Sequence, residues 1–260
     1  MIATVFWEQF GTLSTVDWCE PNYIWSTYVA EWWNATTSLL LAVAGLCGLW
    51  NCIRAKEKLE ARFYLVFIGL FGIGIGSAAF HGTLLRISQA LDELPMIWLS
   101  LVYLYCLALR DDFRLSPDAA RRKRWIWGAG CTLYGLGFAL AYAFAESYFG
   151  LFLLSYGLMA TFIILRSFYL TFQAPRSSTL ERIGWISFLS FVGGLSLLWV
   201  PEHVLLDCDH PFQSFHPHSG WHLTSSIGAY LWGLWSIADR IRIQNRPVVI
   251  KFKLTGPFVE

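Results

Sequence analysis

The stretch FYLVFIGLFGIGIGSAAFHGTLL, residues 63–85, contains no Asp, Glu, Lys or Arg. Roughly 20 apolar residues in a helix span the hydrocarbon core of a bilayer, so this stretch predicts a membrane-spanning helix. Six other runs of comparable character occur along the chain. The seven predicted spans are residues 32–52, 63–85, 91–109, 125–145, 148–172, 183–206 and 219–238. We therefore expect an all-α, polytopic membrane protein, a seven-transmembrane helix bundle.

The overall composition agrees with this class. Of the 260 residues, 56% are hydrophobic and 14% are charged, and the mean hydropathy is +0.48, which is far from the composition of a soluble domain. No internal repeat or low-complexity tract divides the chain. We expect a single domain over residues 1–260, with an acidic N-terminal segment (1–31), the helix bundle (32–238) and a basic tail (239–260).

The Lys and Arg residues predict the orientation of the bundle. Of the 19, all but Arg86 follow the first, third and seventh spans or lie around the connection between the fifth and sixth. Basic residues accumulate on the cytoplasmic side, so the N-terminus is predicted outside or lumenal and the C-terminus cytoplasmic. Residues 1–28 lack the pattern of a cleavable signal peptide. The net charge of +1 gives no reason to expect a nucleic-acid partner.

Polar side chains fall at one predicted depth of the membrane. Ser77 and His81 lie near the outer end of the second span, Asp92 begins the third, and His218 and His222 lie at the start of the seventh. Polar groups in a hydrocarbon core are costly and mark cavities or functional centres. The sequence therefore predicts a site at the outer end of the bundle.

The spacing of these residues points to a metal. His218 and His222 are four residues apart and share a helix face, and His81 supplies a third imidazole. Catalytic zinc has three protein ligands and an open fourth position. Ser77 lies one turn before His81, and Asp92 can accept a proton, so the set has the components of metal-assisted hydrolysis.

Other histidines and the glycines of the second span offer alternatives. His203, His210 and His216 lie between the sixth and seventh spans and are rival ligands, for which we favour a solvated or helix-capping role. The pair Gly72-x-x-x-Gly76 permits close helix contact beside the site.

The N-terminal segment could hold a second cation. Asp17, Glu20, Asn22 and Glu31 could supply the oxygens that calcium prefers, although carboxylates before a helix are favourable by themselves. Two cysteines, Cys19 and Cys208, fall on the predicted outer side, where they could form a disulfide or remain free thiols. The remaining four are expected to be packing residues: Cys47, Cys52, Cys106 and Cys131.

Five motifs together resemble the alkaline ceramidase family of seven-helix amidases, in the wider superfamily of the adiponectin and progestin receptors. The motifs run from the N-terminal segment to the seventh span, so the resemblance covers nearly the whole chain. They are DWCEPNY (17–23), YVAEWWN (28–34), GSAAFH (76–81), LDELPM (91–96) and HSGWH (218–222).

The resemblance implies roles for individual residues. Zinc would be bound by His81, His218 and His222, while Ser77 would steady the oxyanion and Asp92 would act as the base. It further implies a disulfide between Cys19 and Cys208. The implied calcium ligands are Asp17, Trp18 through its carbonyl, Glu20, Asn22 and Glu31.

The implied activity is zinc-dependent hydrolysis of the N-acyl amide of ceramide, dihydroceramide or phytoceramide to a sphingoid base and a fatty acid. We expect a monomer in the endoplasmic reticulum or Golgi membrane. The alternative is a receptor-like or scaffolding member of the superfamily with a mainly structural zinc. The seventh span has no lysine for a retinal Schiff base, and Arg110-Asp-Asp-Phe113 after the third span differs from the signature of G-protein-coupled receptors.

Overall fold

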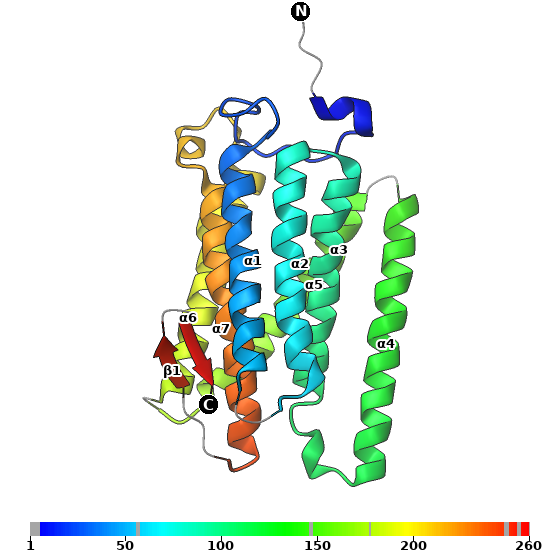
Figure 1. Ribbon diagram of the computed structural model, residues 1–260, viewed down its shortest axis with the longest axis vertical. Coiled ribbons are helices and arrows are strands. Elements are labelled where there is room, and N and C mark those ends of the chain that lie inside the picture. Colours follow the sequence, from blue (N-terminus) through cyan, green and yellow to red (C-terminus); the bar gives the residue numbers. More distant parts are fainter. Residues whose placement is uncertain are drawn as a thin grey trace, which may run out of the picture.

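The computed structural model describes residues 6–55, 58–145, 148–176, 178–246, 250–253 and 256–259. Within these residues seven long helices stand side by side (Figure 1). α6 continues through two π-helical segments, η3 (Leu195–Trp199) and η4 (Pro201–Leu205). The helices are α1 (Trp32–Ile53), α2 (Ala61–Thr83), α3 (Arg86–Ala108), α4 (Pro117–Phe144), α5 (Tyr148–Phe172), α6 (Thr179–Gly194) and α7 (Pro217–Ile243).

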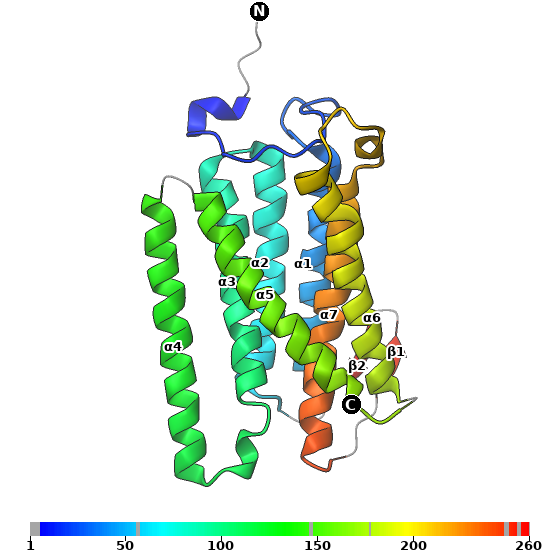
Figure 2. The same ribbon diagram turned by 180° about the vertical axis from the view of Figure 1, so that it is seen from behind.

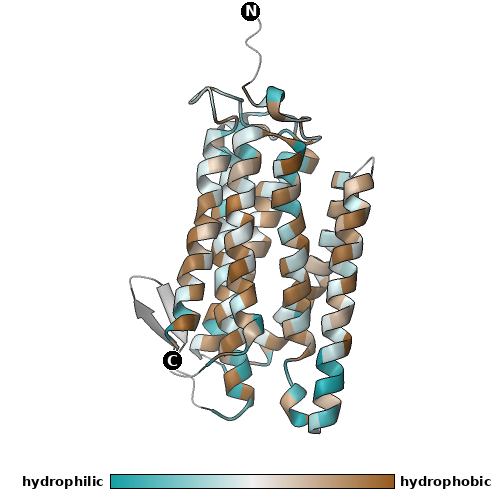
Figure 3. Cartoon of the chain, turned by 45° about the vertical axis from the view of Figure 1, so that its right-hand side comes forward, coloured by the Kyte–Doolittle hydropathy of each residue, from teal (hydrophilic) through white to brown (hydrophobic). Residues whose placement is uncertain are grey.

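Six of the helices are long and apolar enough to cross a membrane, namely α1 to α5 and the continuous α6 to η4 helix. α7 is not among them, although it has 27 residues. Most of α7 is buried among the other helices, and its buried residues include several Ser and His side chains. It therefore needs less apolar surface than a helix that faces lipid. Figure 3 shows the apolar residues along the helices and polar residues gathered at the ends of the bundle.

Short elements connect and close the bundle. Three 3₁₀ segments are η1 (Phe6–Phe10), η2 (Asp112–Arg114) and η5 (Pro211–Phe215). The predicted tail departs from an all-helical fold, because β1 (Ile250–Lys253) and β2 (Gly256–Val259) pair as an antiparallel hairpin. The tail also begins later than predicted, since α7 continues to Ile243.

The start of α4 differs from the predicted span as well. The prediction of 125–145 followed the apolar residues, but the helix begins at Pro117, eight residues earlier. The Ser116 side chain caps it by accepting a hydrogen bond from the Ala119 amide at 3.4 Å, and proline is favoured in the first helical turn. The basic run Arg121–Arg124 thus continues the helix beyond its apolar part.

Helix order places α7 between α1 and α6, with α5 behind α2 and α3 and α4 at the edge (Figures 1 and 2). Glycines of α2 allow close packing. A Cβ on Gly74 would lie 2.2 Å from the backbone nitrogen of Ala42, and one on Gly76 would lie 1.9 Å from the carbonyl oxygen of Leu91. A Cβ on Gly72 would have no atom of another helix within 4 Å. The expected Gly72 and Gly76 pair is therefore half right, because only Gly76 makes a close contact.

Candidate metal centre and active site

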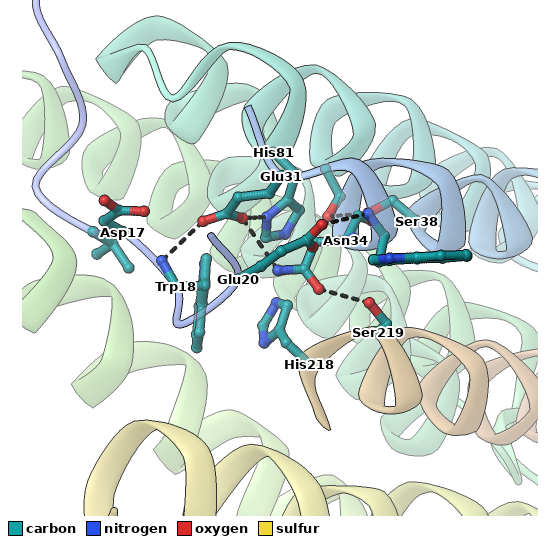
Figure 4. Close-up of polar contacts among 12 residues, drawn as sticks. Asp17, Trp18, Glu20, Glu31, Asn34, Ser38, His81, His218 and Ser219 are labelled. Atoms are coloured by element: carbon teal, nitrogen blue, oxygen red, sulfur yellow. Dashed lines mark hydrogen bonds and ion pairs between the residues drawn. The ribbon is translucent and has the colours of Figure 1, made fainter. Parts of the chain in front are cut away.

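Four helices meet at the end of the bundle covered by the N-terminal segment. α1 begins there, α2 ends there, and α3 and α7 both start there. The polar residues predicted at one depth lie at this one end of the bundle, each within about two turns of these helix ends. Figure 4 shows side chains from α1, α2 and α7 converging with the segment around Trp18.

Three buried histidines form a compact group. The structure brings His81, His218 and His222 together so that one nitrogen of each lies within 4.8 Å of the others. The Nε2 atom of His81 is buried without a hydrogen-bond partner. An unpaired buried nitrogen is costly, and a metal ion would satisfy it. The donor set therefore fits a metal that takes neutral imidazole ligands.

Hydrogen-bonding groups contact two of the imidazoles at Nδ1 and orient their rings. The Nδ1 atom of His81 is hydrogen-bonded to Oε2 of Glu31. The Nδ1 atom of His222 lies 3.0 Å from Oγ1 of Thr37 and 3.3 Å from Oγ of Ser38. Partners of this kind fix the ring orientation of metal ligands, and in both residues they leave Nε2 free for an ion.

His218 adjoins two residues whose contacts with it the sequence did not predict. Oε2 of the buried Glu202 lies 3.5 Å from its Nδ1, and the Trp18 indole stacks on the imidazole with 3.7 Å between ring centroids. Neither Glu202 Oε2 nor His218 Nδ1 has a hydrogen-bond partner among the described residues. The place of Glu202 near the end of the sixth span was a visible signal, because a carboxylate there would need a partner. The stacking of Trp18 had no signal, since the two rings are 200 residues apart.

Ser77 and Asp92 lie beside the histidines. Ser77 Oγ is 3.0 Å from Ser38 Oγ, and Ser77 of α2 and Asp92 of α3 line the same cavity as His218 and His222. The close approach of Gly76 to Leu91 brings the two helices together. A proton acceptor and a hydroxyl donor thus adjoin a metal-binding group.

A long apolar cavity leads away from these residues. Its lining begins at Ser77, Asp92, His218 and His222 and continues along α7 to Trp235. His218 and Trp235 are 17 residues apart, which corresponds to about 25 Å along a helix. Most of the other lining side chains are apolar or aromatic. The lining is thus polar at one end and mainly apolar along the rest, like a molecule with a polar group and a hydrocarbon chain.

The sequence as a whole matches the family described as Ceramidase over residues 11–256. The chain belongs to the ceramidase family. Among its relatives, alkaline ceramidase 3 of Mus musculus is 31% identical over 92% of this chain and 88% of its own length. The putative alkaline ceramidase dcd3A of Dictyostelium discoideum is 26% identical over 95% and 94%, and an alkaline ceramidase of Arabidopsis thaliana is 28% identical over 86% and 82%.

These relatives confirm the expected family, and the chain is a ceramidase enzyme rather than a receptor-like scaffold. The six apolar helices and this family together indicate a membrane protein that acts on a lipid.

In this ceramidase the N-terminal segment folds over the histidines, with Glu20 and Glu31 buried and Asp17 exposed. Glu20 accepts hydrogen bonds from the amides of Trp33 at 2.7 Å and Asn34 at 2.9 Å. Asn22 donates to both carboxylate oxygens of Asp17, at 3.1 and 3.0 Å, and its own Oδ1 is buried without a partner.

The negative charges of the carboxylates in this segment repel one another. Partial desolvation raises the pKa of Asp17, and burial raises the pKa of Glu20. The neighbouring charge of Glu31 raises both pKa values further, against the hydrogen bonds that each accepts. A cation would relieve this repulsion and could use the unpaired Asn22 oxygen. Among the described residues the three histidines are the only cluster of at least three His, Cys, Asp or Glu ligands, so a calcium site here stays a prediction.

A disulfide joins Cys19 to Cys208, with 5.0 Å between their Cα atoms. It links the N-terminal segment of the ceramidase to the connection before α7, across 189 residues. The disulfide alternative is therefore confirmed over two free thiols. The other four cysteines are free, and each is buried or half-buried, as expected of packing residues.

The three rival histidines lie outside the metal-binding group. The His210 side chain caps η5 by accepting a hydrogen bond from the Phe212 amide at 3.2 Å. His203 is half-buried against Trp18 and Trp199, with centroid distances of 4.9 and 5.0 Å. The capping role was right for His210, but the solvated or capping role was wrong for His203, because its ring packs among aromatic side chains. His216 precedes α7 and forms no side-chain cap.

Proposed function

We propose that this ceramidase is a zinc-dependent amidase that hydrolyses the N-acyl amide bond of ceramides within the membrane. One observation carries the proposal: the compact histidine group lies beside Ser77 and Asp92 at the head of a long apolar cavity. The products would be a sphingoid base and a free fatty acid. Relatives named as alkaline ceramidases support this substrate class.

The zinc ligands would be His81, His218 and His222. When bound, zinc supplies a Lewis acid that polarises the amide carbonyl and makes water more acidic. The carboxylate of Glu31 holds the His81 ring in place through Nδ1, and the hydroxyls of Thr37 and Ser38 do the same for His222.

Ser77 and Asp92 would handle the charges and protons of the reaction. Water adds to the carbonyl carbon, and Asp92 takes up the proton that the water loses. The Ser77 hydroxyl donates to the oxyanion that develops on the former carbonyl oxygen. Asp92 then passes the proton to the nitrogen as the C–N bond breaks, so that the amine leaves and the carboxylic acid remains.

Calcium would bind the N-terminal segment through Asp17, the Trp18 carbonyl, Glu20, Asn22 and Glu31. The repulsion among the carboxylates and the unpaired Asn22 oxygen support this assignment. Its role would be structural, because the segment covers the histidine group and shares Glu31 with it.

The topology follows from the positions of the charges. We propose that α7 is a seventh span of a single domain, that the N-terminus is lumenal, and that the protein acts as a monomer in the endoplasmic reticulum or Golgi membrane. Positive residues gather at the end opposite the site, which supports this orientation.

A direct experiment combines activity with metal analysis. The purified protein is incubated with ceramide, dihydroceramide and phytoceramide, and fatty acid release and bound zinc are measured before and after chelation. We expect release from at least one substrate, loss of activity with loss of zinc, and recovery on adding zinc back. Full activity after complete zinc removal would contradict the zinc mechanism, and no release from any ceramide would contradict the proposed reaction.

A further inference from the structure

A second cavity, of about 740 Å³, lies at the other end of the bundle. It is bounded by α2, α3, α4 and the end of α7, and none of its lining residues lines the cavity of the proposed active site. Its lining combines charged and apolar side chains: Glu60, Ala61, Arg62, Leu65, Trp98, Leu101, Val102, Tyr105, Leu109, Arg124, Gly128, Cys131, Thr132, Gly135, Leu136 and Arg240.

The loose packing of α4 creates this space. α4 stands at the edge of the bundle in Figures 1 and 2. It touches α3 through a hydrogen bond of 3.4 Å from the Trp98 indole to the Gly135 carbonyl. Toward its basic end α4 presents Gly128, where an added Cβ would have only a Tyr105 ring atom within 4 Å, at 3.9 Å. A glycine at this position leaves room between the two helices.

Three arginines line the charged part of the cavity, and among the described residues they outnumber the carboxylates paired with them. Glu60 lies 2.6 Å from Arg62 Nη2 and 2.8 Å from Arg240 Nε. Asp112 forms an ion pair with Arg240 at 2.7 Å and accepts a hydrogen bond from Arg124 at 2.6 Å. Three guanidinium groups therefore share two carboxylates.

Arg62 is the least satisfied of the three. Its side chain is only 4% exposed, and its Nε and Nη1 atoms are buried without hydrogen-bond partners. A buried guanidinium with unused donors is costly. Anionic oxygens of a phosphate would satisfy such donors, because guanidinium groups bind phosphate in a forked geometry.

We propose that this cavity binds an anionic phospholipid, with the phosphate at Arg62, Arg124 and Arg240 and an acyl chain against Trp98 and Leu136. The charged residues lie at the helix ends and the apolar ones toward the middle, which matches the layout of a lipid in a bilayer. Basic pockets between membrane helices recognise acidic lipid headgroups. The bound lipid would join α4 to α2, α3 and α7.

The test uses the purified full-length protein in nanodiscs of phosphatidylcholine with a small amount of fluorescent phosphatidylserine. Lipid binding is measured as energy transfer from the tryptophans of the protein to the fluorescent lipid. We expect saturable binding that Arg62→Gln and Arg124→Gln each weaken about tenfold. Arg122→Gln is the matched control, because Arg122 is exposed and lies outside the cavity. Equal binding by fluorescent phosphatidylcholine, or equal loss in the control, would overturn the proposal.

A variant that fills the cavity and a soluble competitor distinguish lipid binding in the cavity from binding of a free anion. Gly128→Leu keeps every charge and favours the helix, so weaker lipid binding by this folded variant would support occupancy of the cavity. Unchanged binding would overturn it. Inorganic phosphate and glycerophosphoserine should compete only weakly, because they lack acyl chains. Competition by inorganic phosphate as effective as that by the lipid would show a free-anion site instead.

Discussion

Oε2 of Glu31 is hydrogen-bonded to Nδ1 of His81 and also accepts from Asn34 Nδ2 at 3.2 Å. The other carboxylate oxygen accepts from the Trp18 amide at 2.9 Å. A single buried carboxylate thus joins the N-terminal segment to the proposed zinc group. The two proposed metal sites cannot be structurally independent, since both depend on this side chain.

The histidine group is tested by replacing one ligand. His81→Ala removes a proposed ligand and leaves two, so we expect loss of bound zinc and at least a hundredfold loss of ceramide hydrolysis. Metal analysis and fatty acid release measure both. His210→Ala is the matched control, because His210 caps η5 away from the group. Normal zinc content and turnover in His81→Ala would contradict the assignment.

Glu31→Gln tests the calcium site. The amide has nearly the same shape but loses the negative charge, so we expect calcium to raise the melting temperature less than in the wild type. Thermal unfolding with and without calcium measures this difference. Glu8→Gln serves as the control, since Glu8 is exposed in η1. An unchanged response to calcium in Glu31→Gln would count against the assignment.

Gly76→Ala tests the contact that brings Ser77 to Asp92. The new Cβ would lie 1.9 Å from the Leu91 carbonyl oxygen, so α2 and α3 must separate. We expect kcat to fall at least tenfold and the melting temperature to fall. Gly72→Ala is the control: no atom of another helix lies within 4 Å of the new Cβ, and alanine favours a helix by about 1 kcal/mol over glycine. Equal kcat values in the two variants would refute the role of Gly76.

Glu202 is expected to position His218 rather than to react. Loss of its charge in Glu202→Gln should weaken zinc binding about 10-fold to 100-fold, as for other residues that orient metal ligands. Zinc titration measures the affinity, and saturating zinc should restore most of the activity. Asp209→Asn, an exposed position in the connection that follows η4, provides the comparison. A wild-type zinc affinity in Glu202→Gln would exclude this role.

The disulfide between Cys19 and Cys208 should stabilise the N-terminal segment that lies over the histidines. Cys19→Ser with Cys208→Ser should lower the melting temperature, because loss of a native disulfide commonly costs about 2–5 kcal/mol. Reducing agent should lower the melting temperature of the wild type but not of this double variant. Cys131→Ser, at a free cysteine, should keep the response to reduction. A double variant as stable as the wild type would contradict the prediction.

Much of the fold could be predicted because its signals are local. An apolar run such as residues 63–85 specifies a helix by its length, and the spacing of His218 and His222 places both on one face. The alternation of helix direction then sets His81 and Asp92 at the same end. These inferences need only helix geometry and the cost of polar groups in hydrocarbon.

The tertiary structure decided which groups touch. The Glu31 contact with His81, the Glu202 contact with His218 and the stacking of Trp18 join residues that are 50, 16 and 200 positions apart. The side-chain distances that create them depend on how whole helices pack, which no local pattern encodes. The sequence alone predicted the three histidines of the proposed metal centre, because their spacing and helix positions are local signals, while only the packed bundle showed which groups contact them.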